Sequence, residues 1–253
     1  MKGQKRLLSF ARRACDDYNM ISPGDTVAVG LSGGKDSLAL LYTMAALRRF
    51  YPVPFRLIAV TIDMRFDEIG KSAADFGSIQ KLCRELDVEY HIEPSNIAKI
   101  VFDIRKESNP CSLCAKLRRG MLCDTAKKLG ANKIALGHHF DDAVQTFMLN
   151  LFYEGRLGCF SPVTYLDRSD VTVIRPFIYA QEKDLSYFTS NAELPVVESE
   201  CPANKKTERE EMKSLLVSLE RENKGLRHRI FGAMQKAGID GYKEAKLKEY
   251  DDE

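Results

Sequence analysis

The sequence lacks a hydrophobic run long enough to cross a bilayer, and it lacks low-complexity tracts and internal repeats. Its formal net charge is only +2, so a basic surface for a polyanionic partner has to come from local clusters. These absences predict a soluble globular protein without a membrane segment. Its 253 residues suit one large α/β domain with a small appendage.

An export signal is also missing, because arginines interrupt the apolar positions of the first 15 residues. We expect an amphipathic N-terminal helix within residues 1–23 and a cytoplasmic location. The chain has seven cysteines, an odd number that argues against a disulfide scaffold. Cys15, Cys83 and Cys123 fall within helical patterns and are expected to be buried small hydrophobes.

Apolar runs alternate with helical patterns along most of the chain. This alternation predicts an α/β fold with a doubly wound, mainly parallel sheet. We expect an N-terminal helix at 1–23, an α/β domain at 24–176 and a C-terminal helical extension at 177–253. Strands are expected at 26–31, 56–62, 88–92, 133–137 and 171–174, and helices at 36–49, 78–86, 115–129, 141–153, 182–192 and 207–222.

One segment has the pattern of a phosphate-binding loop, since it runs from an apolar strand through glycines into a helix start: VAVGLSGGKDS, residues 27–37. Gly33 and Gly34 let backbone N–H groups approach an anion, and the helix N-terminus adds partial positive charge. A Walker-type loop would need glycine where Val29 stands. The dinucleotide-binding glycine spacing is absent as well.

Two further strand ends carry polar side chains, and ligands in an open α/β sheet bind where strand ends converge. The first ends on Asp63, which could meet a ribose or base but equally could cap its strand. The second is Gly137-His138-His139-Phe140-Asp141-Asp142, where either histidine alone could be structural. This string could bind zinc, but carboxylates beside a phosphate loop favour Mg²⁺.

The Cys111-x-x-Cys114 pair is expected in a loop just before a helix. A structural zinc site would need a second pair, and a redox pair would need a thioredoxin-like unit; neither pattern follows. Cys201 offers one more thiolate. Three thiolates suit a [4Fe–4S] cluster with one iron left open, which could hold a sulfur atom.

With these residues in place, the chain resembles the tRNA 2-thiocytidine synthetase family of the ATP-pyrophosphatase superfamily. The likeness runs from Tyr18 to Gln235, and the matching blocks are YNMISPGDTVAVGLSGGKDS, CSLCAKLRRG, KIALGHHFDDAVQTFMLNLFYEGRL and VIRPFIYAQEKDL. The resemblance implies an adenine-nucleotide α-hydrolase-like fold and ATP-dependent activation of C2 of a cytidine in the tRNA anticodon loop. It also implies Mg²⁺, a [4Fe–4S] cluster, a sulfur donor such as a cysteine desulfurase persulfide or sulfide, and a homodimer.

The same resemblance assigns roles to residues of this chain. The expected catalytic residues are Lys35, Asp36 and Asp142, with Asp36 and Asp142 on Mg²⁺. The expected cluster ligands are Cys111, Cys114 and Cys201. The expected ATP-binding residues are Leu31, Ser32, Gly33, Gly34, Lys35, Asp36, Ser37, Asp63, Gly137 and His138. RNA contacts are expected from Lys116, Arg118, Arg119, Arg156, Lys205, Lys206 and Arg209, each of which could also be ordinary surface charge.

Two other functions fit parts of this pattern. An adenylating ligase without a cluster would share the glycine loop, but it would not need the Cys111–Cys114 pair. A non-catalytic Fe–S or RNA-binding module would keep the cysteines, but it would not need the intact Lys35-Asp36-Ser37 sequence. The pattern as a whole therefore favours a thiolating enzyme.

Overall fold

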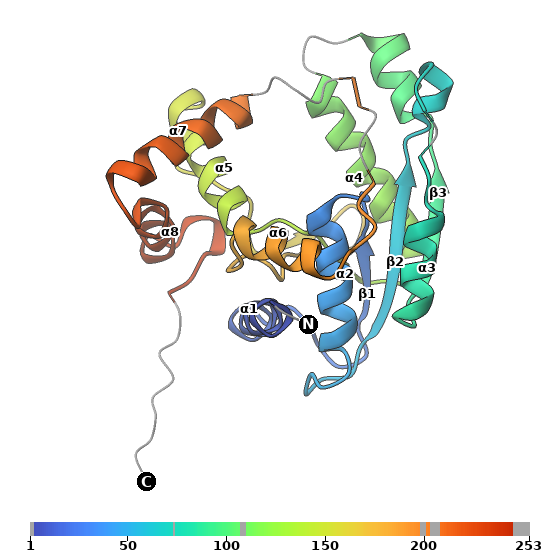
Figure 1. Ribbon diagram of the computed structural model, residues 1–253, viewed down its shortest axis with the longest axis horizontal. Coiled ribbons are helices and arrows are strands. Elements are labelled where there is room, and N and C mark those ends of the chain that lie inside the picture. The colour runs from blue at the N-terminus through green and yellow to red at the C-terminus, as the bar shows by residue number, and fades with distance from the viewer. Residues whose placement is uncertain (1–2, 73, 107–109, 198–200, 203–207, 245–253) are drawn as a thin grey trace.

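The computed structural model describes residues 3–72, 74–106, 110–197, 201–202 and 208–244. In this part of the chain, six strands form one sheet in the order β3-β2-β1-β4-β6-β5 (Figure 1). All pairs are parallel except that of β5 with β6 at one edge. The mainly parallel sheet is confirmed; its strands are β1 Thr26–Gly30, β2 Arg56–Asp63, β3 Glu89–Pro94, β4 Lys133–Ala135, β5 Val163–Leu166 and β6 Val171–Ile174.

Helices cover both faces of the sheet, as a doubly wound fold requires. Val27 and Val29 of β1 belong to a buried cluster that includes side chains of α1, α2 and α3, whereas Ala28 between them belongs to a second cluster with side chains of α4 and η2. The predicted helices are present, and α8 and η2 are additional. The bounds are α1 Gln4–Asp17, α2 Lys35–Leu47, α3 Gly77–Glu85, π-helix η2 Lys99–Arg105, α4 Pro110–Lys128, α5 Phe140–Tyr153, α6 Glu182–Asn191, α7 Glu208–Glu222 and α8 Leu226–Lys236, with 3₁₀ turns η1 Phe66–Ile69 and η3 Ile239–Gly241.

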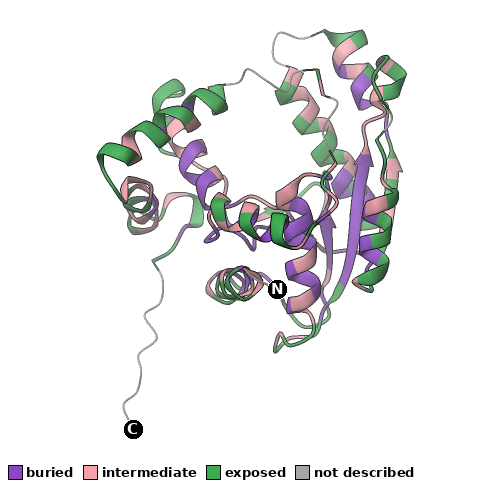
Figure 2. Ribbon diagram, in the orientation of Figure 1, coloured by how far each residue is buried: buried purple, intermediate pink, exposed green. Residues whose placement is uncertain are grey.

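The central strands are buried between the two layers of helices, and the helices expose their outer faces. Figure 2 shows β1 and β2 buried along most of their length, whereas the outer faces of α3, α4 and α7 are exposed. The near-continuous apolar runs of the two strands are what a sheet covered on both faces needs. The sheet therefore forms a rigid base from which the loops at its carboxyl edge project.

The order of the strands reverses at β1. From β1 the chain moves outward to β2 and β3, and it then returns to place β4 on the other side of β1. In open α/β sheets this reversal opens a crevice at the carboxyl ends of the two central strands. The glycine loop follows β1 and the His-His-x-Asp-Asp segment follows β4, so both predicted strand ends lie at this crevice.

One local prediction was wrong. The Cys111–Cys114 pair lies inside the first turns of α4, which begins at Pro110, rather than in a loop before a helix that starts at Ala115. Proline suits the first helical position because its fixed φ matches the helix and its missing N–H has no partner there anyway. The spacing of the two cysteines therefore places their side chains about one helical turn apart.

The C-terminal helices pack onto the same core as the sheet. Leu7 of α1, Leu38 of α2, Phe188 of α6 and Phe231 of α8 belong to one buried cluster. The domain boundaries at 23/24 and 176/177 stay predictions. A search of the described residues found no helix that combines the length and apolar character needed to cross a membrane.

Candidate active site

The glycine loop is held in shape by its own serines. Ser37 Oγ accepts hydrogen bonds from the backbone N–H and the hydroxyl of Ser32, at 3.2 and 3.3 Å, and donates to the Gly34 carbonyl at 2.8 Å. Gly33 has a φ of 81°, in the left-handed region that favours glycine. No side chain caps the N-terminus of α2 after Gly34. The loop is therefore preformed, and its free helix N-terminus suits an anion.

The segment after β4 lies directly against this loop. A Cβ added to Gly137 would lie 3.1 Å from the carbonyl carbon and oxygen of Asp36, so a glycine is needed for this close approach. His139 caps α5 while Asp142 Oδ2 accepts its backbone N–H at 3.0 Å, a reciprocal capping box. The two predicted strand ends therefore meet at one edge, as expected.

His138 and Asp63 have different surroundings. Burial, followed by the charge of Arg175, lowers the pKa of His138 to about 4, so its imidazole is neutral near pH 7. The buried Nδ1 atom of His138 has no hydrogen-bond partner among the described residues, and its ring lies 5.0 Å from that of Phe160. Asp63 ends β2 and accepts the backbone N–H of Arg65 at 2.9 Å, which is a turn-capping role. Its place at the nucleotide stays a prediction.

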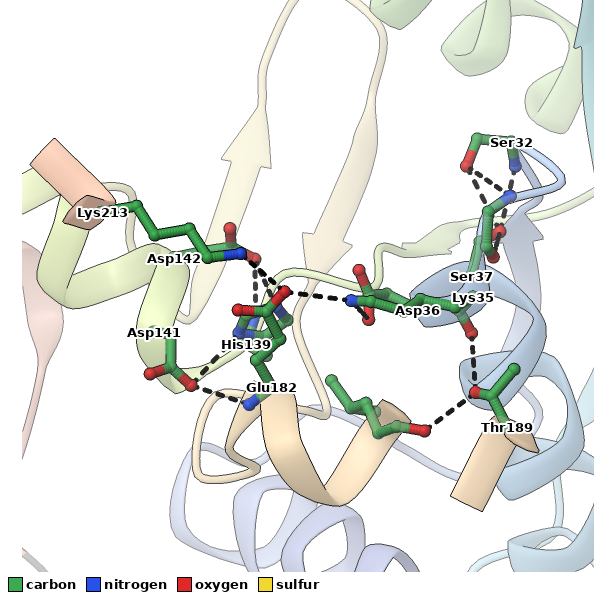
Figure 3. A network of polar contacts seen from close by, with 12 residues as sticks. Ser32, Lys35, Asp36, Ser37, His139, Asp141, Asp142, Glu182, Thr189 and Lys213 are labelled. Carbon is green, nitrogen blue, oxygen red and sulfur yellow. Dashed lines mark hydrogen bonds and ion pairs between the residues drawn. The ribbon is translucent and has the colours of Figure 1, made fainter. Parts of the chain in front are cut away.

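A series of ion pairs connects Lys35, at the end of the loop, with residues of α6 and α7 (Figure 3). Lys35 Nζ lies 2.8 Å from Asp36 Oδ1 and 3.4 Å from Glu182 Oε1, and Lys213 Nζ lies 2.9 Å from the same oxygen of Glu182. Burial lowers the pKa of Lys35, but Asp36 and Glu182 outweigh it and hold that pKa above the usual value. Burial raises the pKa of Glu182, but Lys213 and Lys35 outweigh it and hold it below its usual value. Lys35 and Glu182 are therefore both charged at neutral pH.

Glu182 and Lys213 were not predicted from the sequence as residues of this site. Glu182 is an acidic residue in the first turn of a predicted helix, and Lys213 lies on the polar face of another. Both patterns are typical of solvated helices, so neither carried a local signal. Only the docking of α6 and α7 beside the loop brings these two side chains to it.

The two aspartates of α5 are paired with cations from the C-terminal helices. Arg209 of α7 lies 3.1 Å from Asp142 Oδ1, and Arg227 of α8 lies 2.7 Å from Asp141 Oδ1. Arg209, predicted to bind RNA, thus contacts the predicted catalytic carboxylate. The described His, Cys, Asp and Glu side chains form no group of three placed to hold a metal ion. A Mg²⁺ site at Asp36 and Asp142 stays a prediction.

The three predicted cluster cysteines lie near one another. Burial raises the pKa of Cys114, the charge of Arg118 lowers it, and the charges of Cys201 and Cys111 raise it further. Cys111 and Cys201 therefore both lie within electrostatic range of the Cys114 thiol, although the three residues come from two chain segments. Within the described residues the three thiols do not form a metal-holding group, so ligation would need the side chains to move. Three thiols beside an arginine are a donor set that fits an iron–sulfur cluster.

The chain just before the third cysteine contacts the glycine loop. The backbone N–H of Val197 donates to the Gly33 carbonyl at 3.0 Å, and a Cβ on Gly33 would lie 3.1 Å from Val197 Cβ. Cys201 follows four positions later, within about 14 Å of chain. Residues 198–200 lie outside the described part of the chain. The two predicted centres, the loop and the thiols, therefore lie at the same end of the sheet.

The other cysteines behave as core residues. Cys15, Cys83 and Cys123 are buried, as predicted, and burial raises the pKa of each, to about 12 for Cys83. Cys159 is half-buried, with Sγ 3.4 Å from the Ala143 carbonyl, and burial raises its pKa to about 11. These thiols stay protonated at neutral pH. Because burial also raises the pKa of Cys114, position in the fold rather than pKa separates the core cysteines from the proposed ligands.

The predicted RNA contacts fall on two sides of the site. Lys116, Arg118 and Arg119 are exposed on α4, and Arg156 is exposed after α5, where it pairs with Glu154 at 2.6 Å. Lys205 and Lys206 lie outside the described residues. Figure 1 shows α4 on one side of the loop that starts α2, with α5, α6 and α7 on the other side.

The glycine loop at the switch point of this sheet defines a PP-loop domain, and the family model described as "PP-loop domain" matches residues 5–220. Two similar curated proteins are a Geobacter sulfurreducens protein, 38% identical over 91% of this chain and 89% of its own length, and a Pseudomonas putida (strain GB-1) protein, 39% identical over 92% and 84%. Both are named tRNA-cytidine(32) 2-sulfurtransferase. This chain belongs to their family of PP-loop transferases.

Among solved structures, the chain is similar to the U34-tRNA thiolase NcsA from Methanococcus maripaludis, described with its [4Fe–4S] cluster. The TM-score is 0.72 at 25% sequence identity, over 95% of this chain and 80% of that one. The similarity thus extends through the C-terminal helices as well as the sheet. The predicted family and the predicted fold class are both confirmed.

Proposed function

We propose that this chain catalyses ATP-dependent, iron–sulfur-dependent thiolation of tRNA and converts a cytidine of the anticodon loop to 2-thiocytidine. The relatives named above supply the class of reaction. The observation that carries the proposal is the link between Val197 and Gly33, which ties the Cys201 segment to the phosphate loop. An activating site and a sulfur-handling site at one end of one sheet can act on the same base.

The chemistry needs both sites. The C2 carbonyl of cytidine is a poor electrophile, so its oxygen attacks the α-phosphate of ATP; an O–P bond forms and pyrophosphate leaves. A sulfur nucleophile then attacks C2, and the former carbonyl oxygen departs with AMP. Each step replaces one bond at phosphorus or carbon, with no net redox change in the base.

The residues of the loop serve the first step. The amides of Gly33 and Gly34 and the ammonium of Lys35 stabilise charge that develops on the phosphates. The surrounding residues Leu31, Ser32 and Ser37 shape the loop, Asp63 faces the ribose or base, and Gly137 and His138 close the other side. Asp36 and Asp142 are the proposed ligands of Mg²⁺, which assists departure of pyrophosphate.

Cys111, Cys114 and Cys201 would hold a [4Fe–4S] cluster. When bound, it supplies an iron without a protein ligand, at which sulfur can be held for transfer. Burial holds the pKa of the Cys114 thiol above its usual value and the charge of Arg118 opposes this, while the helical turn between Cys111 and Cys114 fixes two ligands relative to each other. Sulfur comes from a donor such as a cysteine desulfurase persulfide or sulfide.

Binding of tRNA falls to the cations around this end of the sheet. Lys116, Arg118 and Arg119 on α4, with Arg156 and Arg209 on the opposite side, would contact backbone phosphates. A homodimer in the cytoplasm is the working form that we propose.

The test is direct. The full chain, purified and loaded with iron and sulfide without oxygen, is incubated with unfractionated tRNA, ATP, Mg²⁺ and sulfide, and the digested nucleosides are analysed by mass spectrometry. We expect 2-thiocytidine only when ATP is present, together with AMP and pyrophosphate. A thiolated uridine as the product would correct the target base, and no thiolation with full ATP turnover would contradict the proposal.

A further inference from the structure

Two ammonium groups beside the glycine loop share one carboxylate oxygen. Lys35 Nζ and Lys213 Nζ lie 3.4 and 2.9 Å from Glu182 Oε1 (Figure 3). Lys35 comes from the loop itself, whereas Lys213 comes from α7, far along the chain. Like charges this close would repel each other without the carboxylate between them.

Glu182 is held in place independently of both lysines. It is the first residue of α6, and its backbone N–H donates to Asp141 Oδ2 at 2.7 Å. Asp141 is in turn paired with Arg227. The backbone of Glu182 is therefore anchored at the start of α6, whereas the lysines are long side chains that can change partners.

The docking of α7 does not depend on Lys213. Met212 and Leu216 of α7 are buried in the main core, and Arg209 pairs with Asp142. The Lys213 side chain is 38% exposed, and its ammonium group meets Glu182 of α6, the carboxylate that also pairs with Lys35 of the loop. A buried contact would serve α7 better if stability were the only purpose, since half-exposed ion pairs contribute little.

We propose that Lys213 is a second pyrophosphate-binding residue of this site, supplied by the C-terminal extension. When the polyphosphate enters the loop, Lys213 moves from Glu182 to a phosphate oxygen, alongside Lys35. While the polyphosphate is absent, the Glu182 carboxylate pairs with both ammonium groups and keeps them close to each other. The leaving group carries several negative charges, so a second cation stabilises it in a way that one lysine cannot. This inference rests on the proposed ATP site and adds a residue to it.

The experiment measures binding of inorganic pyrophosphate with Mg²⁺ to the full chain by calorimetry, without tRNA. Lys213→Met should weaken binding about tenfold, the usual cost of one charge-assisted hydrogen bond, and Lys213→Arg should restore most of the affinity. Glu182→Gln removes a negative charge beside the phosphates, so it should leave the affinity unchanged or raise it. Lys183→Met and Glu210→Gln, on exposed residues of α6 and α7, are the matched controls and should have no effect.

The opposite effects of the two substitutions separate direct binding from scaffolding. If the ion pair only docked α7, breaking it from either side would weaken binding alike, and this result would overturn the proposal. Wild-type affinity in Lys213→Met would overturn it as well. Lys35→Ala separates a failure of the proposed ATP site from a failure of the role of Lys213. If both Lys35→Ala and Lys213→Met bind pyrophosphate normally, the phosphate-loop assignment itself fails. If only Lys35→Ala loses binding, the loop assignment stands and only the role of Lys213 is removed.

Discussion

The phosphate loop and the cysteine centre share one end of the sheet, but they are built differently. The loop is contiguous in sequence and preformed, with Ser32 and Ser37 locked by hydrogen bonds. The cysteine centre joins Cys111 and Cys114 on the outer end of α4 to Cys201 in another segment, and its thiols are neighbours without being a finished metal site. The loop is therefore preformed for the nucleotide that we propose, whereas the proposed cluster site would be completed only when its ligands move together.

The largest expected effect is on the cysteine side. Cys111→Ser, Cys114→Ser or Cys201→Ser should each abolish thiolation, because two remaining thiolates do not hold a cubane cluster stably. Iron content and visible absorbance after anaerobic loading measure the loss, and ATP binding should survive. Cys83→Ser and Cys123→Ser are the controls and should keep the iron. Full iron and activity in Cys201→Ser would remove that residue from the centre.

The next effect is on the loop side. Lys35→Ala should slow ATP-dependent pyrophosphate release by a factor on the order of 10²–10³, because it removes a charge that acts mainly in the transition state. Its iron content should match that of the wild type, so the two halves of the comparison respond separately. Turnover at the wild-type rate would contradict the assignment of the loop.

A smaller effect is expected at the start of α5, on the side of the loop opposite α4. Asp142→Asn keeps an oxygen that can accept the His139 N–H, so the capping bond persists and stability should fall by only about 1 kcal/mol or less. Activity should fall further than this, on the order of tenfold or more, because a proposed ligand of Mg²⁺ is lost. Melting curves and rates of pyrophosphate release, measured on the same variant, separate a role in stability from a role in catalysis. A large drop in melting temperature with full activity of the folded fraction would show that Asp142 only caps α5.

The smallest perturbation uses the cluster-free chain. Alkylation with iodoacetamide at pH 8, followed by peptide mass spectrometry, should modify exposed Cys111 first and leave Cys83 unmodified, since burial raises the pKa of Cys83 to about 12. Raising the pH toward 10 should increase the rate at Cys114, whose pKa is raised, more than that at Cys83. Equal rates at Cys83 and Cys111 would show that the two classes of cysteine do not differ.

The same contrast explains what the sequence could predict. The glycine loop, the buried strands and the start of α5 each depend on contiguous residues, so local sequence patterns predicted them. The pairing of Asp142 with Arg209 and of Glu182 with Lys213 depends on how α7 docks, which no local pattern encodes. The sequence also did not predict β5, the short antiparallel edge strand, or the start of α4 at Pro110. Four residues and one helical turn carry too little periodic signal.

The central claim is that the loop and the thiols of one chain form a single thiolation centre. It is tested most directly by mixing Lys35→Ala with Cys201→Ser in equal amounts and measuring 2-thiocytidine in tRNA by mass spectrometry. Each variant keeps the half that the other lacks, yet no chain in the mixture has both. We expect no thiolation beyond that of either variant alone; recovery of wild-type thiolation in the mixture would show that the loop and the thiols need not belong to one chain.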